Sequence, residues 1–106
     1  MPHTIRLRDP WEFGPGRSWL RQFGLPTGLT SNDRVWLVVD RPLAAATVGL
    51  NDTLLGEVVA GALGRFDVTN LLRPRNVAVV GLDPADDGTS SAAIGAVRLE
   101  IESAAM

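Results

Sequence analysis

The 106-residue sequence contains no cysteine and no lysine, and its only histidine is His3. The lack of cysteine excludes disulfides, thiol nucleophiles and thiolate metal sites. All ten basic residues are arginines, and because they are scattered in a chain of net charge −2, a nucleic-acid-binding surface is not expected. We interpret the arginine usage mainly as coding bias. An arginine-lined site for phosphate or carboxylate is the functional alternative.

Long hydrophobic runs are also missing. The segment 1–13 carries four charged residues, and nothing in the chain is long and apolar enough for a signal-peptide core or a membrane span. We therefore expect no membrane association, and a cytoplasmic location if the chain is the whole gene product. For an excised module the compartment stays open. Hydrophobic residues make up 45% of the chain and charged residues 21%, as in an ordinary globular protein, and the length predicts one domain spanning 1–106.

Proline and glycine interrupt the sequence every few residues, and short β-rich runs lie between them. A helix over 53–63 is disfavoured because Gly56 and Gly61 would each cost about 1 kcal/mol relative to alanine. The pattern predicts an all-β fold, an antiparallel β-sandwich or jelly roll of about eight strands. The expected strands are 4–7, 18–24, 34–40, 45–50, 53–59, 64–68, 76–82 and 97–102, with loops at 9–17 and 83–91.

Several local patterns refine this prediction. The continuous apolar run V-W-L-V-V at 35–39 is typical of a central strand covered on both faces, and it makes Trp36 a core or near-core residue. Residues 97–102 alternate between apolar and charged, so one side of that strand is expected in the core. Asn51-Asp52 indicates a hairpin turn. Asp67 and Thr69 are predicted to cap one helical turn at 69–72 through their short polar side chains.

Three motifs follow one another in an order typical of one β-sandwich family. W-L-R-Q-F-G-L-P (19–26) precedes the apolar run, V-G-L-N-D-T-L-L-G (48–56) fits a V-x-L-N-G-x-x-x-G hairpin, and F-D-V-T-N-L-L (66–72) precedes an Asn-led strand. A last segment, 94–99, also fits. Over about residues 17–102 the chain thus resembles the N-terminal sugar-binding domain of glycoside hydrolase family 2, which has a galactose-binding-domain-like jelly roll.

The resemblance implies a non-catalytic carbohydrate-binding module, because the family's catalytic carboxylates lie in a barrel that this sequence does not contain. Glu57, Glu100 and Glu102 do not suggest a carboxylate pair facing across a cleft, and His3 is an unsuitable triad base. Related jelly rolls often hold calcium, for which Asp67 or a loop with Asp83, Asp86 and Asp87 would be the ligands. The loop lacks a known calcium pattern, so a solvated turn is favoured and no metal or cofactor is expected.

Four residues are candidates for sugar binding. Trp11 lies in a Pro/Gly-rich loop, where an exposed indole would stack on a pyranose; the alternative, which we favour, is that it plugs the open end of the sandwich. Arg17, Asn51 and Arg65 could donate hydrogen bonds to hydroxyl groups. Trp19 is expected to be half buried.

Two further features bear on function. Asp52 stands where the family usually has glycine, so the hairpin turn could be of a different type. The segments A-T-V-G-L and V-V-A-G-A-L could form a flat apolar patch, which suggests self-association. The alternative function is therefore a structural or protein-interaction sandwich, as a homodimer or as a brace for a separate catalytic subunit.

Overall fold

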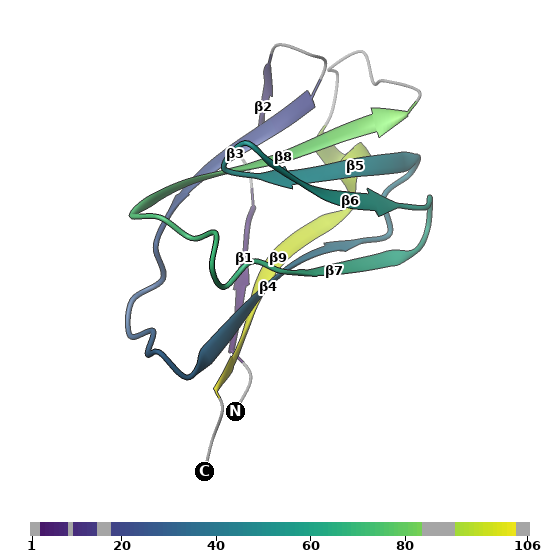
Figure 1. The fold of residues 1–106 in the computed structure, drawn as a ribbon. Helices are drawn as coiled ribbons and strands as arrows, with labels where there is room; N and C mark the ends of the chain where they lie inside the picture. Colours follow the sequence, from purple (N-terminus) through teal and green to yellow (C-terminus); the bar gives the residue numbers. More distant parts are fainter. Residues whose placement is uncertain (1–2, 9, 15–17, 84–90, 104–106) are drawn as a thin grey trace.

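The computed structural model describes residues 3–8, 10–14, 18–83 and 91–103, which form two antiparallel sheets packed face to face (Figure 1). The four-stranded sheet has the order β1-β9-β4-β7, and the five-stranded sheet has the order β2-β3-β8-β5-β6. The predicted all-β, jelly-roll-like sandwich is confirmed. The strands are β1 (His3–Arg6), β2 (Glu12–Gly14), β3 (Ser18–Gly24), β4 (Asp33–Asp40), β5 (Ala45–Leu50), β6 (Thr53–Val58), β7 (Leu63–Asp67), β8 (Arg75–Asp83) and β9 (Ala96–Ser103).

The core lies between the sheets and is built from alternating residues of the central strands. In β4, Val35, Leu37 and Val39 are buried in the core cluster. In the neighbouring β9, every second residue from Val97 to Ile101 is also buried there. The facing strands β5 and β8 contribute their own alternate residues. Because successive side chains of a strand point to opposite faces, this pattern fixes which residues are left for the outer faces. The core-cluster residues of β9, β5 and β8 are Val97, Leu99, Ile101, Ala46, Val48, Leu50, Ala78, Val80 and Leu82.

The expected loop at 9–17 contains a strand that the sequence did not reveal. β2 has only three residues and pairs with the first half of β3, with Phe13 opposite Trp19. Pro10 shortly before it and Gly14 at its end concealed it, because proline and glycine normally break a strand. At 91–94 a short 3-10 helix precedes β9. The rest of the acidic loop, with Asp86 and Asp87, lies outside the described residues. Within the described part of the chain, no helix has the length and hydrophobicity needed to span a membrane.

The sandwich has two ends, which we name after one residue at each. The Asn51 end, on the left of Figure 1, carries the β5–β6 turn, the β7–β8 connection and the β3–β4 loop. The Leu43 end, on the right, carries the β4–β5 loop and the β6–β7 turn. At this second end the two connections are bonded to each other, since Gly61 N–H donates to Pro42 O and Arg41 N–H donates to Ala62 O, both at 2.8 Å.

The β5–β6 hairpin has a two-residue turn at Asn51 and Asp52, as predicted. Both residues have positive φ, 51° and 67°, as in the type I′ turn that Asn-Gly usually forms. The substitution of Asp for Gly has therefore left the turn two residues long, with a left-handed conformation at Asp52 that an L-residue adopts at some cost.

Candidate functional site

Trp11 is buried, with 9% of its surface exposed, and its indole N–H donates to the carbonyl of Leu7 at 2.9 Å. This position matches the plug interpretation. An indole in this position presents no open face for stacking on a sugar. Trp19 is buried more fully than expected, because it points into the core, where Phe13 meets it edge-on at 5.1 Å between ring centroids.

Asn51 is also buried, and the fold uses its side chain fully. Its Nδ2 donates to Leu71 O and to Asn76 Oδ1, both at 2.9 Å, while its Oδ1 accepts from Val77 N–H at 2.9 Å. Asn76 in turn accepts from the N–H of Arg73 and donates to its carbonyl. These bonds tie the hairpin to the β7–β8 connection and leave Asn51 no donor for a ligand.

The remaining candidates lie apart. Arg17 falls outside the described residues, and Arg65 lies on the outer face of the four-stranded sheet. The structure therefore does not bring Trp11, Asn51 and Arg65 into one site. A sugar-binding role for these residues stays a prediction.

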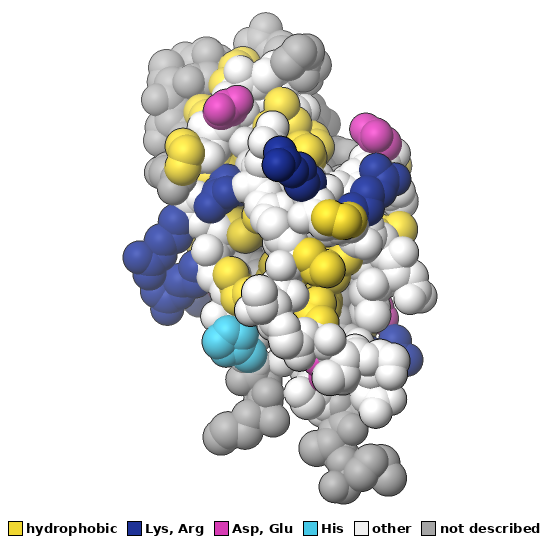
Figure 2. All heavy atoms as spheres, turned by 90° about the vertical axis from the view of Figure 1, so that its left-hand side faces the viewer, with side chains coloured by type: hydrophobic (Ala, Val, Ile, Leu, Met, Phe, Trp, Pro, Cys, Tyr) yellow, Lys and Arg dark blue, Asp and Glu magenta, His cyan; other side chains and the backbone are white. Residues whose placement is uncertain are grey.

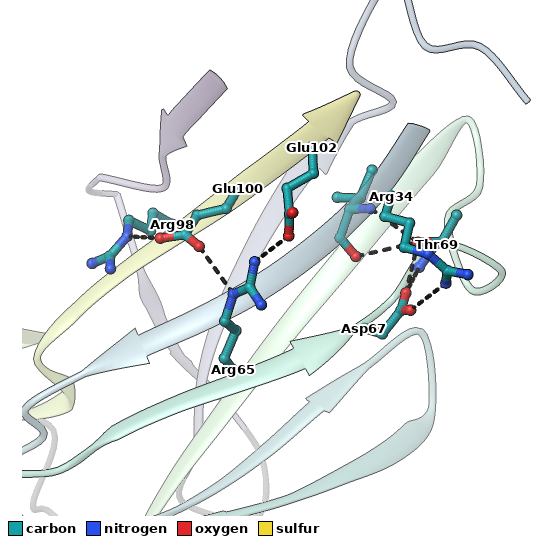
Figure 3. Close-up of polar contacts among 8 residues, drawn as sticks. Arg34, Arg65, Asp67, Thr69, Arg98, Glu100 and Glu102 are labelled. Atoms are coloured by element: carbon teal, nitrogen blue, oxygen red, sulfur yellow. Dashed lines mark hydrogen bonds and ion pairs between the residues drawn. The ribbon is translucent and has the colours of Figure 1, made fainter. Parts of the chain in front are cut away.

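Arg65 of β7 belongs to a network of charged side chains that Figure 3 shows reaching to β9, and that continues to Asp40 of β4. Its Nε contacts Glu100 Oε1 at 3.1 Å, and its other arm reaches Glu102. Glu100 also accepts from Arg98 Nε at 2.9 Å, and Arg98 continues to Asp40 at 3.3 Å. The five side chains form one alternating chain of charges that spans the sheet.

This network covers two apolar side chains on the outer face of the sheet, Trp36 and Val38. The guanidinium carbon of Arg65 lies 3.9 Å from the ring centroid of Trp36, a cation–π contact, and Val38 between the two arginine-bearing strands has no exposed surface. Trp36, expected in or near the core, lies near it rather than in it. Alternation turns it to the outer face, where it is half buried, and its indole N–H has no hydrogen-bond partner among the described residues.

The network shifts the ionisation of its members. The hydrogen bond from Arg98 holds the pKa of Glu100 below its usual value, with Arg65 adding to the effect. The pKa of Arg65 is raised, chiefly by its hydrogen bond to Glu102, and that of Arg98 is raised by Glu100. All these shifts favour the charged forms. Glu100 is thus favoured in its ionised form, whereas a general acid must be protonated.

Asp67 and Thr69 form a smaller cluster on the same sheet (Figure 3). Asp67 Oδ1 accepts from Thr69 N–H at 3.0 Å and from its hydroxyl at 2.6 Å, and Arg34 contacts the other carboxylate oxygen at 3.0 Å. These bonds, above all the one from the Thr69 hydroxyl, lower the pKa of Asp67. Asp67 thus accepts from a backbone N–H at the start of the segment, as predicted, but the Thr69 hydroxyl binds Val35 and Asp67 instead of capping. The expected helical turn is wrong, since the segment closes as a hydrogen-bonded turn from Val68 to Leu71.

Metal binding finds no support in the described residues, among which no cluster of three or more His, Cys, Asp or Glu could hold an ion. Asp67, one of the calcium candidates, is engaged by Thr69 and Arg34. The side chains of Asp83, Asp86 and Asp87 are not among those described.

The Leu43 end carries a hydrophobic patch, which we define as Leu43, Val59 and Leu63. Their exposed fractions are 76%, 71% and 53%, among the highest of the large hydrophobic side chains described. Leu43 and Val59 lie on the two connections that hydrogen-bond to each other, and Leu63 is the first residue of β7, so backbone contacts hold the patch in place. The sequence contained part of this signal in V-V-A-G-A-L. The other segment, A-T-V-G-L, instead points its apolar side chains into the core from β5.

The fold and these surfaces define a two-sheet, jelly-roll-like β-sandwich without a catalytic constellation among its described residues. No protein-family model and no curated protein matches the sequence. Solved structures do match in fold. A β-glucuronidase from Bacteroides uniformis is 18% identical, with a TM-score of 0.72 over 95% of this chain. A Bifidobacterium dentium β-glucuronidase complexed with coumarin-3-O-glucuronide is 22% identical, with a TM-score of 0.62 over 82% of this chain.

The chain spans only about a fifth of each of these enzymes, 18% and 21% of their lengths. At this level of identity the likeness establishes a shared fold. It agrees with the family 2 resemblance that the motifs indicated, and the fold it establishes is that of a small part of a glycosidase.

Sequence reasoning missed the cross-sheet network because its partners lie far apart in the sequence. Arg65 and Glu100 are 35 residues apart, and Arg98 and Asp40 are 58 apart. The alternation at 97–102 was the available signal, because it placed Arg98, Glu100 and Glu102 on one face. Their partners emerge only from the register of β4 between β7 and β9.

Proposed function

We propose that this chain is a non-catalytic accessory β-sandwich that acts by packing against another protein. Three points support a contact role over catalysis. The chain corresponds to a small part of the glycosidases it resembles in fold, the pKa of Glu100 is lowered by its arginine partners, and the residues suggested for sugar contact lie apart.

The observation that carries the proposal is the Leu43 patch. Three large apolar side chains project from backbone segments fixed by two hydrogen bonds of 2.8 Å, where a monomer gains nothing from their exposure. The expected occupant is an apolar surface of a partner polypeptide. A patch of this size is far below the ~1,000 Å² typical of stable interfaces, so the contact is expected to be weak unless other surfaces join it.

For the isolated chain, the available apolar surface is a second copy. We expect self-association at high micromolar concentration, measured by sedimentation equilibrium. Replacing Leu43 and Val59 together by serine should abolish it. The matched control is Leu54→Ser, because Leu54 is 70% exposed but lies in β6 beside the other end of the sandwich. A monomer at every concentration, or equal loss in the control, would count against the proposal.

Carbohydrate binding is the second candidate, and the surface around Trp36 is the observation that favours it. An aromatic ring flanked by Arg65, Glu100 and Glu102 offers the stacking and hydrogen-bonding groups that sugars need. Arg65 covers the ring, so a sugar would have to displace it. A glycan array with Arg65→Ala and Trp11→Ala proteins tests this directly. Binding that depends on Arg65 alone would favour this face; no binding to any glycan would remove the candidate.

A further inference from the structure

The second half of β3 is an open sheet edge. β2 pairs with β3 only from Ser18 to Leu20, while β8 pairs with β3 along its whole length to Gly24. Beyond Leu20, no described strand lies on the β2 side of β3. Gln22 and Gly24 are both exposed there, although the sheet continues on their other side.

The direction of the free backbone groups follows from the hydrogen bonds of Val77. Its N–H and C=O bind Asn51, at 2.9 and 3.0 Å, and therefore point away from β3. Gln22 is opposite Val77, so this is a non-hydrogen-bonded pair and the N–H and C=O of Gln22 point to the open side. Two residues later the alternation repeats, and Gly24 presents its own pair of groups to the same side.

The chain prevents β2 from closing this edge. Continuing the β2–β3 register by two residues would place Pro10 opposite Gln22, and proline has no N–H to donate. The guanidinium of Arg21 takes over part of that role. Its Nε donates to Arg8 O at 2.7 Å, and its NH1 donates to the carbonyl of Gln22. The carbonyl of Gln22 therefore accepts from a side chain rather than from a neighbouring strand.

The surroundings of the edge are basic. Arg8, Arg21, Arg73 and Arg75 form no ion pair with any described carboxylate, whereas Arg34, Arg41, Arg65 and Arg98 are all paired elsewhere. Figure 2 looks onto the Asn51 end, where dark blue basic side chains border a central band of hydrophobic ones. A shallow groove beside the edge has Phe23, Pro74 and Val77 in its walls.

We propose that this edge binds an extended acidic peptide segment of a partner protein by strand addition. The incoming strand pairs with Gln22 and Gly24, and its N–H replaces the Arg21 guanidinium at the Gln22 carbonyl. The released guanidinium, with Arg73 and Arg75 nearby, then meets acidic side chains of the peptide. Main-chain bonds supply the affinity of such complexes, and the unpaired cations supply the preference for acidic residues. This site is separate from the Leu43 patch and does not depend on it.

The test uses a blocked six-residue peptide of alternating glutamate and threonine, with a lysine–threonine peptide as its charge control. We expect the first to slow hydrogen exchange at the amides of Gln22 and Gly24 and to bind less well at high salt. The lysine peptide should bind at least about tenfold more weakly. No protection of these amides at millimolar peptide, or equal binding of both peptides, would overturn the proposal.

Two matched changes locate the backbone bonds. Gln22→Pro removes an N–H that points away from β8, so the β3–β8 pairing is kept, and it should weaken peptide binding about tenfold, while Gln22→Ser should not.

If the proline variant fails to fold, the peptide can be changed instead. In one peptide the backbone nitrogens of the glutamates are methylated, and in another those of the threonines. Only one of these two peptides should lose binding, because a strand bonds through alternate residues. Equal binding of both methylated peptides would contradict strand addition. Peptide binding should persist in the Leu43→Ser, Val59→Ser protein, so this proposal and the proposed function can fail separately.

Discussion

Asn51 takes the place of a strand residue opposite Val77. Its side-chain oxygen does the work of a backbone carbonyl, and its own backbone N–H supplies the donor. Val77 N–H donates to Asn51 Oδ1 at 2.9 Å, and Asn51 N–H donates to Val77 O at 3.0 Å. The β5–β8 pairing ends one position earlier, at Leu50 and Ala78. One asparagine thus turns the chain and satisfies the backbone groups of a neighbouring strand, which explains why a residue that resembles a ligand-binding group is buried.

This relationship predicts opposite effects for the two turn residues. Asn51→Gly permits the positive φ but removes the side-chain bonds to Leu71 O, Val77 N–H and Asn76 Oδ1, of which only Asn76 Oδ1 keeps another partner, so it should lower the free energy of unfolding by about 2–3 kcal/mol. Asp52→Gly relieves a left-handed L-residue at an exposed position and should raise that free energy by about 0.5–1 kcal/mol. Urea unfolding of both variants checks this. Equal destabilisation by the two changes would show that the turn's conformation, and not the Asn51 side chain, limits stability.

The lowered pKa of Asp67 predicts a pH-dependent loss of stability. Its carboxylate has a lower pKa when folded than when unfolded, mainly because the Thr69 hydroxyl donates to it. The stabilisation is therefore complete above the unfolded pKa of about 3.9 and is lost as the pH falls through the folded value.

The test is Thr69→Val, which removes that hydroxyl. The difference in unfolding free energy between wild type and variant should be larger at about pH 7 than at about pH 2. A residual difference is expected at low pH, because the hydroxyl also accepts from Val35 N–H at 2.9 Å. A difference that does not change with pH would show that Asp67 gains nothing from Thr69.

Close packing before β9 predicts a large effect at Gly95. A Cβ there would lie 2.3 Å from Asp40 O and 2.8 Å from the carbonyl carbon of Arg41, and φ is +80°. Gly95→Ala should therefore cost about 2–4 kcal/mol in thermal or urea unfolding. Gly28→Ala is the control, since Gly28 has φ of +78° with no atom near its would-be Cβ, and it should cost only about 1 kcal/mol. Similar costs at both sites would mean that backbone strain alone matters.

The contact between Arg65 and Trp36 predicts a change in fluorescence. Arg65→Ala uncovers the indole ring, so acrylamide should quench tryptophan emission more strongly and the emission should shift to longer wavelength. The other two indoles, Trp11 and Trp19, are buried and should not respond. Arg65→Lys should give an intermediate result, because a lysine covers the ring less fully. Unchanged quenching in the alanine variant would argue against this contact in solution.

Much of the fold could be predicted because its signals are local. The apolar run at 35–39 and the alternation at 97–102 identified two central strands, and Asn51-Asp52 identified the hairpin between β5 and β6. β2 was missed because three residues beside Pro10 contain no recognisable period. The outward orientation of Trp36 could not be predicted, because a continuous apolar run does not show which of its residues point outward.

The surfaces were harder to predict, because they depend on pairing between distant segments. Arg65 was selected as a hydrogen-bond donor, but its carboxylate partners are set by strand register. The exposure of Leu43 depends on the contact between the β4–β5 loop and the β6–β7 turn. The free edge at Gln22 becomes visible only once β2 is placed and Pro10 is seen to end its pairing.

The proposed contact with another polypeptide at the Leu43 end requires that the patch itself drives association. Sedimentation equilibrium of the wild-type chain, the Leu43→Ser, Val59→Ser double variant and the Leu54→Ser control measures this most directly. The wild type and the control should associate in a concentration-dependent manner at high micromolar protein, and the double variant should stay monomeric. Association that persists unchanged in the double variant, or a wild type that stays monomeric throughout, would contradict it.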